Sequence, residues 1–165
     1  MRKGEIDAKD YFFLTKKQFK KFKEKKKFIE YAKVHKNFYG TLKSQVFKSF
    51  KKKKIVFFDV DWQGARVLRN KLEGYCFSIF LLPPTIATLR KRLMKRHKDN
   101  PKIALERLNY AKEDIKHYNE YDYLVINNNL NKCISVLSKK INEILRDKKI
   151  VSNSSVVAKR MLRFK

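Results

Sequence analysis

Short apolar runs alternate with stretches of helical periodicity between residues 55 and 146, and this order limits the possible folds more than any other feature of the sequence. The run 55–61 is largely apolar and ends in carboxylates, which predicts a buried parallel strand that carries acids to its carboxyl edge. Apolar runs at 77–82 and 121–127 predict two further strands, and the first of these is expected to be buried. This order indicates an α/β fold with a parallel sheet covered by helices, and ligands at the carboxyl ends of the strands.

Four stretches between and after these runs have the apolar spacing of helices. One is expected over 63–72, and another is expected to begin near Thr85. Asn100-Pro101 ends that second helix and opens a third. The closing helix is expected to bury a single stripe of apolar side chains along one face. The inward positions of the first helix are Ala65, Leu68 and Leu72. The apolar positions at helical spacing are Ile86, Leu89 and Leu93 in the second helix, and Ala104, Leu108, Ala111, Ile115 and Tyr118 in the third. The core stripe of the closing helix is Leu130, Ile134, Leu137, Ile141 and Ile144.

The first fifty residues follow a different pattern and are expected to form a smaller inserted lobe. Short strands are predicted at 10–14 and 28–34, separated by a lysine-rich helix that carries Phe19 and Phe22. Residues 38–41 are expected to form a turn into another helix. Residues 148–165 lack a clean period and are expected to be a basic C-terminal extension, frayed or weakly helical.

Several classes of protein are excluded by what the sequence lacks. The four glycines (Gly4, Gly40, Gly64 and Gly74) are too far apart to form the glycine-rich phosphate loops GxGxxG or GxxxxGK[ST]. The two cysteines and three histidines show no metal-ligand spacing, so structural zinc is not expected. No apolar run reaches the roughly 18 to 20 residues of a membrane helix, and no signal-peptide pattern opens the chain. We therefore expect a cytoplasmic protein with no membrane contact.

A large excess of basic residues gives the chain a formal charge of +26, with 42 basic against 16 acidic side chains. Such a charge would ordinarily indicate a nucleic-acid partner. However, Lys, Asn, Ile, Phe and Tyr, which AT-rich codons encode, fill 76 of the 165 positions. Codon bias with a solvated surface accounts for the excess more simply, so nucleic acid is not the expected partner, although anionic small molecules would still be attracted.

Six segments, taken together and in order, resemble the guanylate kinases over about residues 2–146. They are RKGEIDAKDYFF, FIEYAKVHKNFYGT, IVFFDVDWQG, FLLPP, the LRKRLMKR helix with ALERLNYAKEDI after it, and YDYLVIN. The resemblance implies transfer of the γ-phosphoryl group of ATP to GMP, giving ADP and GDP, with Mg²⁺ as cofactor. It also implies a P-loop-kinase-like sheet flanked by helices in a domain over 1–147, with a small α+β GMP-binding lobe at about 3–50 and a helical lid at about 90–108.

The matching positions in the lobe imply a GMP site. Glu30 matches the glutamate that reads guanine, whose carboxylate can accept from the N1 and N2 hydrogens. Thr41 matches the hydroxyl that supports this recognition. Tyr11 and Tyr39 match phenols that donate to the GMP phosphate, beside Arg2, whose planar fork suits phosphate oxygens.

The remaining matches imply the machinery of phosphoryl transfer. Asp59 is placed near Mg²⁺, which it would hold through water, and Asp61 near the GMP. The arginines would stabilise charge on the migrating phosphoryl group, which is most of what enzymes contribute to this reaction. The implied catalytic residues are Arg92, Arg96, Arg107 and Asp59, and the implied ATP-binding residues are Arg92, Arg96 and Asn127.

Departures from the family pattern leave alternatives open. The family begins with a strand and a P-loop, and this sequence has no match to them, so we expect the chain alone to be inactive and to lack that first strand. A missing N-terminal segment or self-association could complete the sheet. Ala8 and Lys36 also stand where glycine is usual. The alternatives are a non-catalytic GMP-binding or protein-interaction module and a basic nucleic-acid-binding protein.

Overall fold

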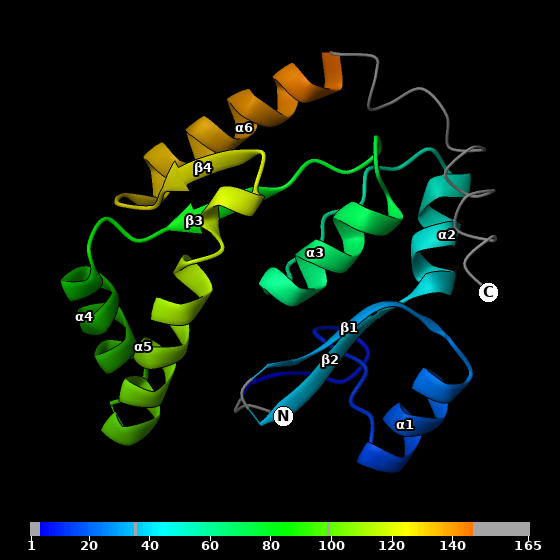
Figure 1. Cartoon of the computed structure of the whole chain (residues 1–165), viewed down its shortest axis with the longest axis horizontal. Helices are drawn as coiled ribbons and strands as arrows, with labels where there is room; N and C mark the ends of the chain where they lie inside the picture. The colour runs from blue at the N-terminus through cyan, green and yellow to red at the C-terminus, as the bar shows by residue number, and fades with distance from the viewer. Residues whose placement is uncertain (1–3, 35, 99, 147–165) are drawn as a thin grey trace. The chain divides into compact units, whose positions relative to one another are not determined.

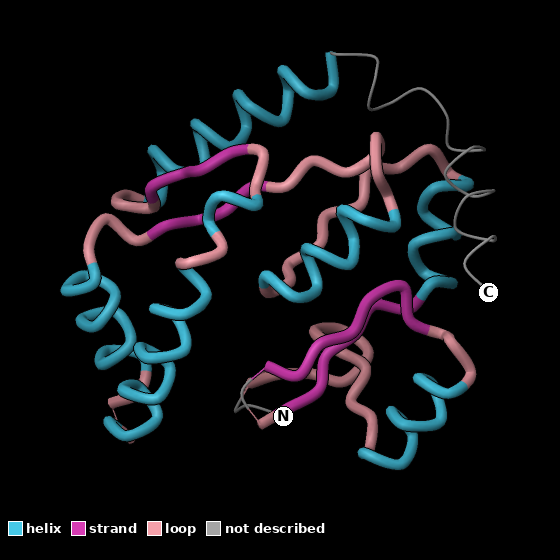
Figure 2. The backbone as a smooth tube through the Cα atoms, viewed as in Figure 1, coloured by secondary structure: helices cyan, strands magenta, loops and turns pink. Residues whose placement is uncertain are grey.

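The computed structural model describes residues 4–34, 36–98 and 100–146, and it divides the chain into two compact units (Figure 1). The first unit ends at Val56 and the second begins at Phe57. The predicted extension at 148–165 lies outside the described residues. Each unit contains a separate pair of strands, coloured magenta in Figure 2, so the fold is mixed α/β as expected.

The first unit consists of helix α1 (Lys16–Glu24), an antiparallel hairpin and helix α2 (Lys43–Lys51). The hairpin pairs β1 (Phe28–Val34) with β2 (Asn37–Leu42), in a register that runs from Phe28↔Leu42 to Val34↔Asn37. The predicted strand at 28–34 and the lysine-rich helix are therefore confirmed. The turn expected at 38–41 is wrong, because this stretch pairs with β1 as a strand. The strand expected at 10–14 is also wrong, because only an isolated bridge between Asp7 and Tyr11 forms there.

Local sequence signals explain why α1 begins where it does and how it packs. Thr15 and Gln18 form a capping box, in which each side chain accepts a hydrogen bond from the other residue's backbone N–H. The aromatic residues of α1 then pack on the hairpin. Phe19 stacks on Phe28 with ring centroids 4.7 Å apart, and Phe22 lies 6.1 Å from the same ring. This aromatic cluster fixes α1 to the hairpin.

The second unit places two parallel strands among helices (Figure 1). Its elements are α3 (Trp62–Lys71), β3 (Ile79–Leu82), α4 (Ile86–Arg96), α5 (Pro101–Ile115), the short 3₁₀ helix η1 (Tyr118–Glu120), β4 (Tyr123–Ile126) and α6 (Leu130–Arg146). The ladder runs from Ile79↔Tyr123 to Leu82↔Ile126. Thr85 caps α4, and Asn100 caps α5 with Pro101 at the first position, so these predicted helix starts are confirmed.

The strand predicted at 55–61 is wrong. This stretch forms no strand, and Phe57 is 73% exposed. An apolar run becomes a strand only where a neighbouring backbone completes its hydrogen-bond ladder, and no described strand pairs with these residues.

Two burial predictions in the second unit also need correction. The stripe expected along α6 fails at its first turns, because Leu130 is 67% exposed and Ile134 is also exposed, while Cys133 is the helix's buried residue. In β3 the expected full burial fails, because Leu81 is half exposed. A sheet of two strands offers too narrow a surface to bury a whole helical stripe or both faces of a strand. In α3, by contrast, Ala65, Leu68 and the adjoining Leu72 are buried as predicted.

Candidate functional site

A buried carboxylate in the hairpin is the first unit's most unusual polar feature. Glu30 is only 4% exposed, and Thr41 lies directly opposite it across the two strands. The Thr41 hydroxyl donates a hydrogen bond of 2.5 Å to Glu30 Oε1. A buried carboxylate is costly unless it is hydrogen-bonded, so this contact both stabilises and orients it.

Tyr39 and Tyr11 lie beside this pair. Tyr39 pairs with Ala32, two residues along the ladder, so its side chain shares a face with Glu30 and Thr41. The ring of Tyr11 meets that of Tyr39 edge to face, with centroids 6.0 Å apart. Four of the residues implied for GMP binding therefore gather in one unit. Of the other two residues in this set, Arg2 lies outside the described residues and Asp61 belongs to the second unit.

A compact loop holds Tyr11 in place. Ala8 N donates to Tyr11 O at 2.7 Å, and the carboxylates of Asp7 and Asp10 accept from the backbone N–H groups of Phe13 and Ile6, each at 2.8 Å. Ala8 has a φ of 61°, in the left-handed region that favours glycine. The loop therefore adopts the geometry of a glycine turn at the position where the family pattern has glycine.

The two acids of the DxD sequence have different surroundings. Asp61 caps α3, because its Oδ1 accepts from Gly64 N at 3.0 Å and its Oδ2 accepts from Gln63 Nε2 at 2.9 Å. Asp59 is exposed in the extended segment before the helix. Among the described residues, no three His, Cys, Asp or Glu side chains gather as metal ligands. Asp59 fits Mg²⁺ only in the usual mode of a single carboxylate with waters and substrate phosphates.

Arg92 reaches the end of β4. Its Nη1 donates to Asn127 O at 2.7 Å and its Nη2 donates to Asn128 O at 3.0 Å. The structure thus brings Arg92 and Asn127 together at the carboxyl edge of the parallel strands. Arg96 is exposed one turn further along α4, and Arg107 is half-buried on α5. The predicted site residues therefore form two sets, one on each unit.

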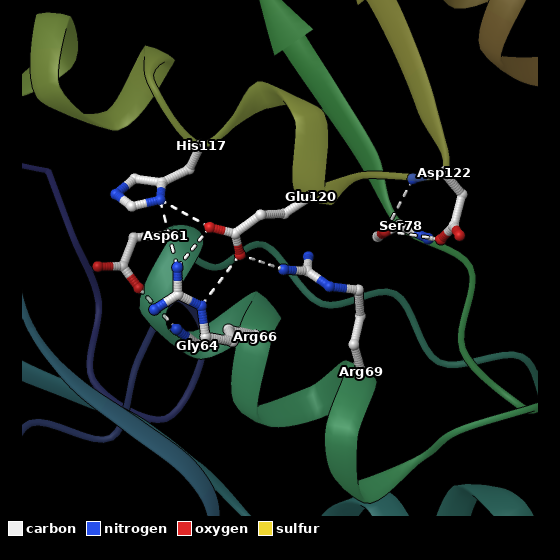
Figure 3. A network of polar contacts seen from close by, with 8 residues as sticks. All are labelled: Asp61, Gly64, Arg66, Arg69, Ser78, His117, Glu120 and Asp122. Atoms are coloured by element: carbon white, nitrogen blue, oxygen red, sulfur yellow. Dashed lines mark hydrogen bonds and ion pairs between the residues drawn. The ribbon is translucent and has the colours of Figure 1, made fainter.

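An ionic network that the sequence did not reveal centres on Glu120 in η1 (Figure 3). Glu120 Oε2 accepts from Arg66 Nε at 3.0 Å and from Arg69 Nη2 at 2.8 Å, while Oε1 pairs with Arg66 Nη2 and with His117 Nδ1. The hydrogen bonds from Arg66, aided by His117, lower the pKa of Glu120 to about 2. The same pair raises the pKa of Arg66. Glu120 is therefore ionised under ordinary conditions and ties α3 to the segment before β4.

Ring contacts and a second carboxylate add to the contacts around the Glu120 network. Trp62 stacks on His117 with centroids 3.7 Å apart, and the Arg69 guanidinium lies 4.8 Å from the centre of the Tyr121 ring. Beside the network, Asp122 Oδ2 accepts from both Ser78 N at 2.7 Å and Ser78 Oγ at 2.6 Å (Figure 3). The contact joins the beginnings of β3 and β4. The only signal in the sequence was the three-residue spacing of Arg66 and Arg69, which puts both on one helix face.

The fold is that of an α/β protein in which helices flank short sheets, and comparison with known proteins defines its family. The family model for guanylate kinase matches residues 1–144. The solved guanylate kinase from Anaplasma phagocytophilum superposes with a TM-score of 0.73 at 29% identity, over 99% of this chain and 78% of that one. The chain therefore belongs to the guanylate kinase family.

Curated relatives give the same result. A guanylate kinase from Buchnera aphidicola subsp. Baizongia pistaciae is 45% identical over 139 residues, which cover 84% of this chain and 67% of that protein. A guanylate kinase from Bartonella henselae is 39% identical over 136 residues, which cover 82% of this chain and 61% of that protein. The chain thus spans about two-thirds of the length of these relatives. Within the described residues, no helix is long and apolar enough to cross a membrane.

Proposed function

We propose that this chain recognises GMP through the hairpin of its first unit and serves the ATP- and Mg²⁺-dependent phosphorylation of GMP to GDP. The observation that carries the proposal is the Glu30–Thr41 pair, in which a nearly fully buried carboxylate is oriented by a hydroxyl from the facing strand. A buried acid in a small basic unit costs stability, which favours a role in binding.

The chemistry of this pair suits guanine. The carboxylate of Glu30 accepts hydrogen bonds from N1–H and from the N2 amino group, whereas adenine presents an acceptor at N1 and has no N2 amino group. Tyr11 and Tyr39, whose ring centroids are 6.0 Å apart, provide phenolic donors for the phosphate. Arg2 adds a cation by resemblance to the family.

The second unit supplies the groups for transfer in this proposal. Arg92, Arg96 and Arg107 stabilise negative charge on the migrating phosphoryl group, and Asn127 contributes to the ATP site. Asp61 would contribute to GMP binding, as the same resemblance implies. Asp59 would hold Mg²⁺ through water; when bound, the ion neutralises charge on the ATP phosphates.

Calorimetry with the full chain tests the binding step. GMP should bind and AMP should not. Glu30→Gln should weaken GMP binding by about 10- to 100-fold, because charge-assisted hydrogen bonds to the base are lost. Glu24→Gln is the matched control, since Glu24 is exposed on α1, and it should leave the affinity unchanged. The absence of GMP binding to folded protein would refute the proposal.

A coupled ADP-release assay separates catalysis from binding. The printed sequence has no glycine-rich phosphate loop, so we expect negligible turnover of ATP and GMP by these 165 residues alone. GMP binding without turnover is the expected result, and the second candidate, a non-catalytic GMP-binding module, gives the same result for these residues alone. Ordinary turnover would show that these residues need no glycine-rich phosphate loop and would contradict this expectation.

A further inference from the structure

The first unit carries a dense array of lysines on and after α1. Eight of the twelve residues 16–27 are lysine and one is acidic, and all eight lysines are exposed. Lys16, Lys20 and Lys23 are spaced four and three apart, so they form one stripe along the helix. Lys20 pairs with Glu24, but their charged atoms are 3.9 Å apart and both side chains are largely exposed. The stripe therefore presents almost uncompensated positive charge.

Half-exposed aromatic rings lie directly beside this stripe. Tyr31 pairs with Gly40 and Phe38 pairs with Lys33, so both rings are on the hairpin face opposite to Glu30 and Thr41. Tyr31 is 43% exposed and Phe38 is 49% exposed. Contacts join the rings to α1, because Lys23 Nζ lies 4.8 Å from the Tyr31 ring centre and the Phe38 ring lies 5.4 Å from that of Phe19. Composition alone could not show this arrangement.

Packing of α1 argues against a lipid surface as the partner. A helix that binds membranes inserts a free apolar face. Here Phe19 and Phe22, the apolar residues of α1, already pack on Phe28. Cations next to flat, partly exposed rings are instead the features that bind single strands, whose phosphates need positive charge and whose unstacked bases need a ring to stack on.

We propose that Lys16, Lys20, Lys23, Tyr31 and Phe38, together the lysine–aromatic face, bind single-stranded nucleic acid. The lysines neutralise backbone phosphates, and the two rings stack on bases without reading their sequence. This face is distinct from the GMP site, because the two sets of side chains project from opposite sides of the same hairpin. Its occupation therefore does not depend on GMP recognition.

Fluorescence anisotropy with the full chain tests the proposal. The probes are labelled single strands of about 12 nucleotides, one of RNA and one of DNA, and a duplex of the same length, at about 0.15 M salt. We expect a single strand to bind more tightly than the duplex, and the RNA–DNA comparison identifies the preferred sugar. The triple variant Lys16→Gln/Lys20→Gln/Lys23→Gln should weaken binding at least about tenfold and reduce the salt slope by about 2, since each phosphate contact contributes roughly 0.7.

A second triple variant controls for net charge. Lys91→Gln/Lys95→Gln/Lys98→Gln removes the same charge from exposed positions in and after α4, and it should weaken binding less than about threefold. Tyr31→Val should weaken binding about fivefold or more without altering the salt slope, in protein whose circular dichroism is unchanged. Equal losses in the two triple variants, duplex binding as tight as single-strand binding, or binding only to anionic vesicles would each overturn the proposal.

Discussion

Replacement of Glu120 by glutamine tests whether the ionic network stabilises the second unit. The substitution keeps the size of the side chain but removes the charge that Arg66, Arg69 and His117 share. Arg69 should dominate the loss, because its side chain is only 17% exposed and its Nη1 is buried without a hydrogen-bond partner. A hydrogen bond to a charged group contributes about 1.5–3 kcal/mol. Arg66 is half exposed and should add little. We therefore expect Glu120→Gln to lower the free energy of unfolding by about 2 kcal/mol.

Urea denaturation measures this loss, and the chain offers both a local probe and a matched control. Trp62 is the single tryptophan and stacks on His117, so its fluorescence reports on the surroundings of the Glu120 network. Circular dichroism reports on the helices. Glu113 pairs with Lys116 at 2.6 Å, but both side chains are largely exposed. Glu113→Gln should therefore cost less than about 0.5 kcal/mol. Equal losses for the two variants would refute the argument that burial of Arg69 gives the network its strength.

Three further outcomes follow from the geometry. The pKa of Glu120 is about 2 in the folded protein and 4.5 ordinarily, so its contribution to stability is present above pH 4.5 and is lost as the pH falls towards 2. In urea titrations, the difference in the free energy of unfolding between wild type and Glu120→Gln should therefore shrink across that pH range. Ala8→Gly should raise the free energy of unfolding in urea titrations by about 1 kcal/mol, since it relieves a left-handed φ of 61°. A lower free energy of unfolding in this variant would show that the loop is not strained. Gly40→Ala should cost about 1–3 kcal/mol in denaturant titrations, because its Cβ would lie 3.0 Å from Phe28 Cδ1 and 3.1 Å from Glu30 O.

Elements whose signals are local could be predicted from the sequence. The capping residues before α4 and α5 and the apolar spacing of α3 gave the correct helices, because a helix satisfies its own backbone hydrogen bonds. The segment 55–61 has an equally strong apolar signal but no ladder partner among the described strands, so it is not a strand. Strand prediction fails in this way because a strand also needs hydrogen bonds from a neighbouring strand, which can be distant in the sequence.

The residues of the candidate site also differ in whether the sequence could predict them. Glu30 and Thr41 were predicted from their place in family-like segments, and the hairpin then put them directly opposite each other. The Glu120 network could not be predicted, since its partners Arg66 and Arg69 are 54 and 51 residues away in sequence. Charge pairs at such separations depend on the packing of α3 against η1, and no periodicity records that packing.

The register of the β1–β2 hairpin links the two binding surfaces proposed for the first unit. Side chains alternate between the faces of a strand, so a slip of one residue would exchange Glu30 for Tyr31 on the carboxylate face and would disrupt the lysine–aromatic face at the same time. Gly40 favours this register, because a Cβ there would lie only 3.0 Å from Phe28 Cδ1 and 3.1 Å from Glu30 O. Glu30→Gln and the α1 lysine triple should each weaken one ligand alone, whereas Gly40→Ala should weaken GMP and single-stranded nucleic acid together. Loss of one ligand only in the Gly40 variant would show that the two faces are not joined through the ladder.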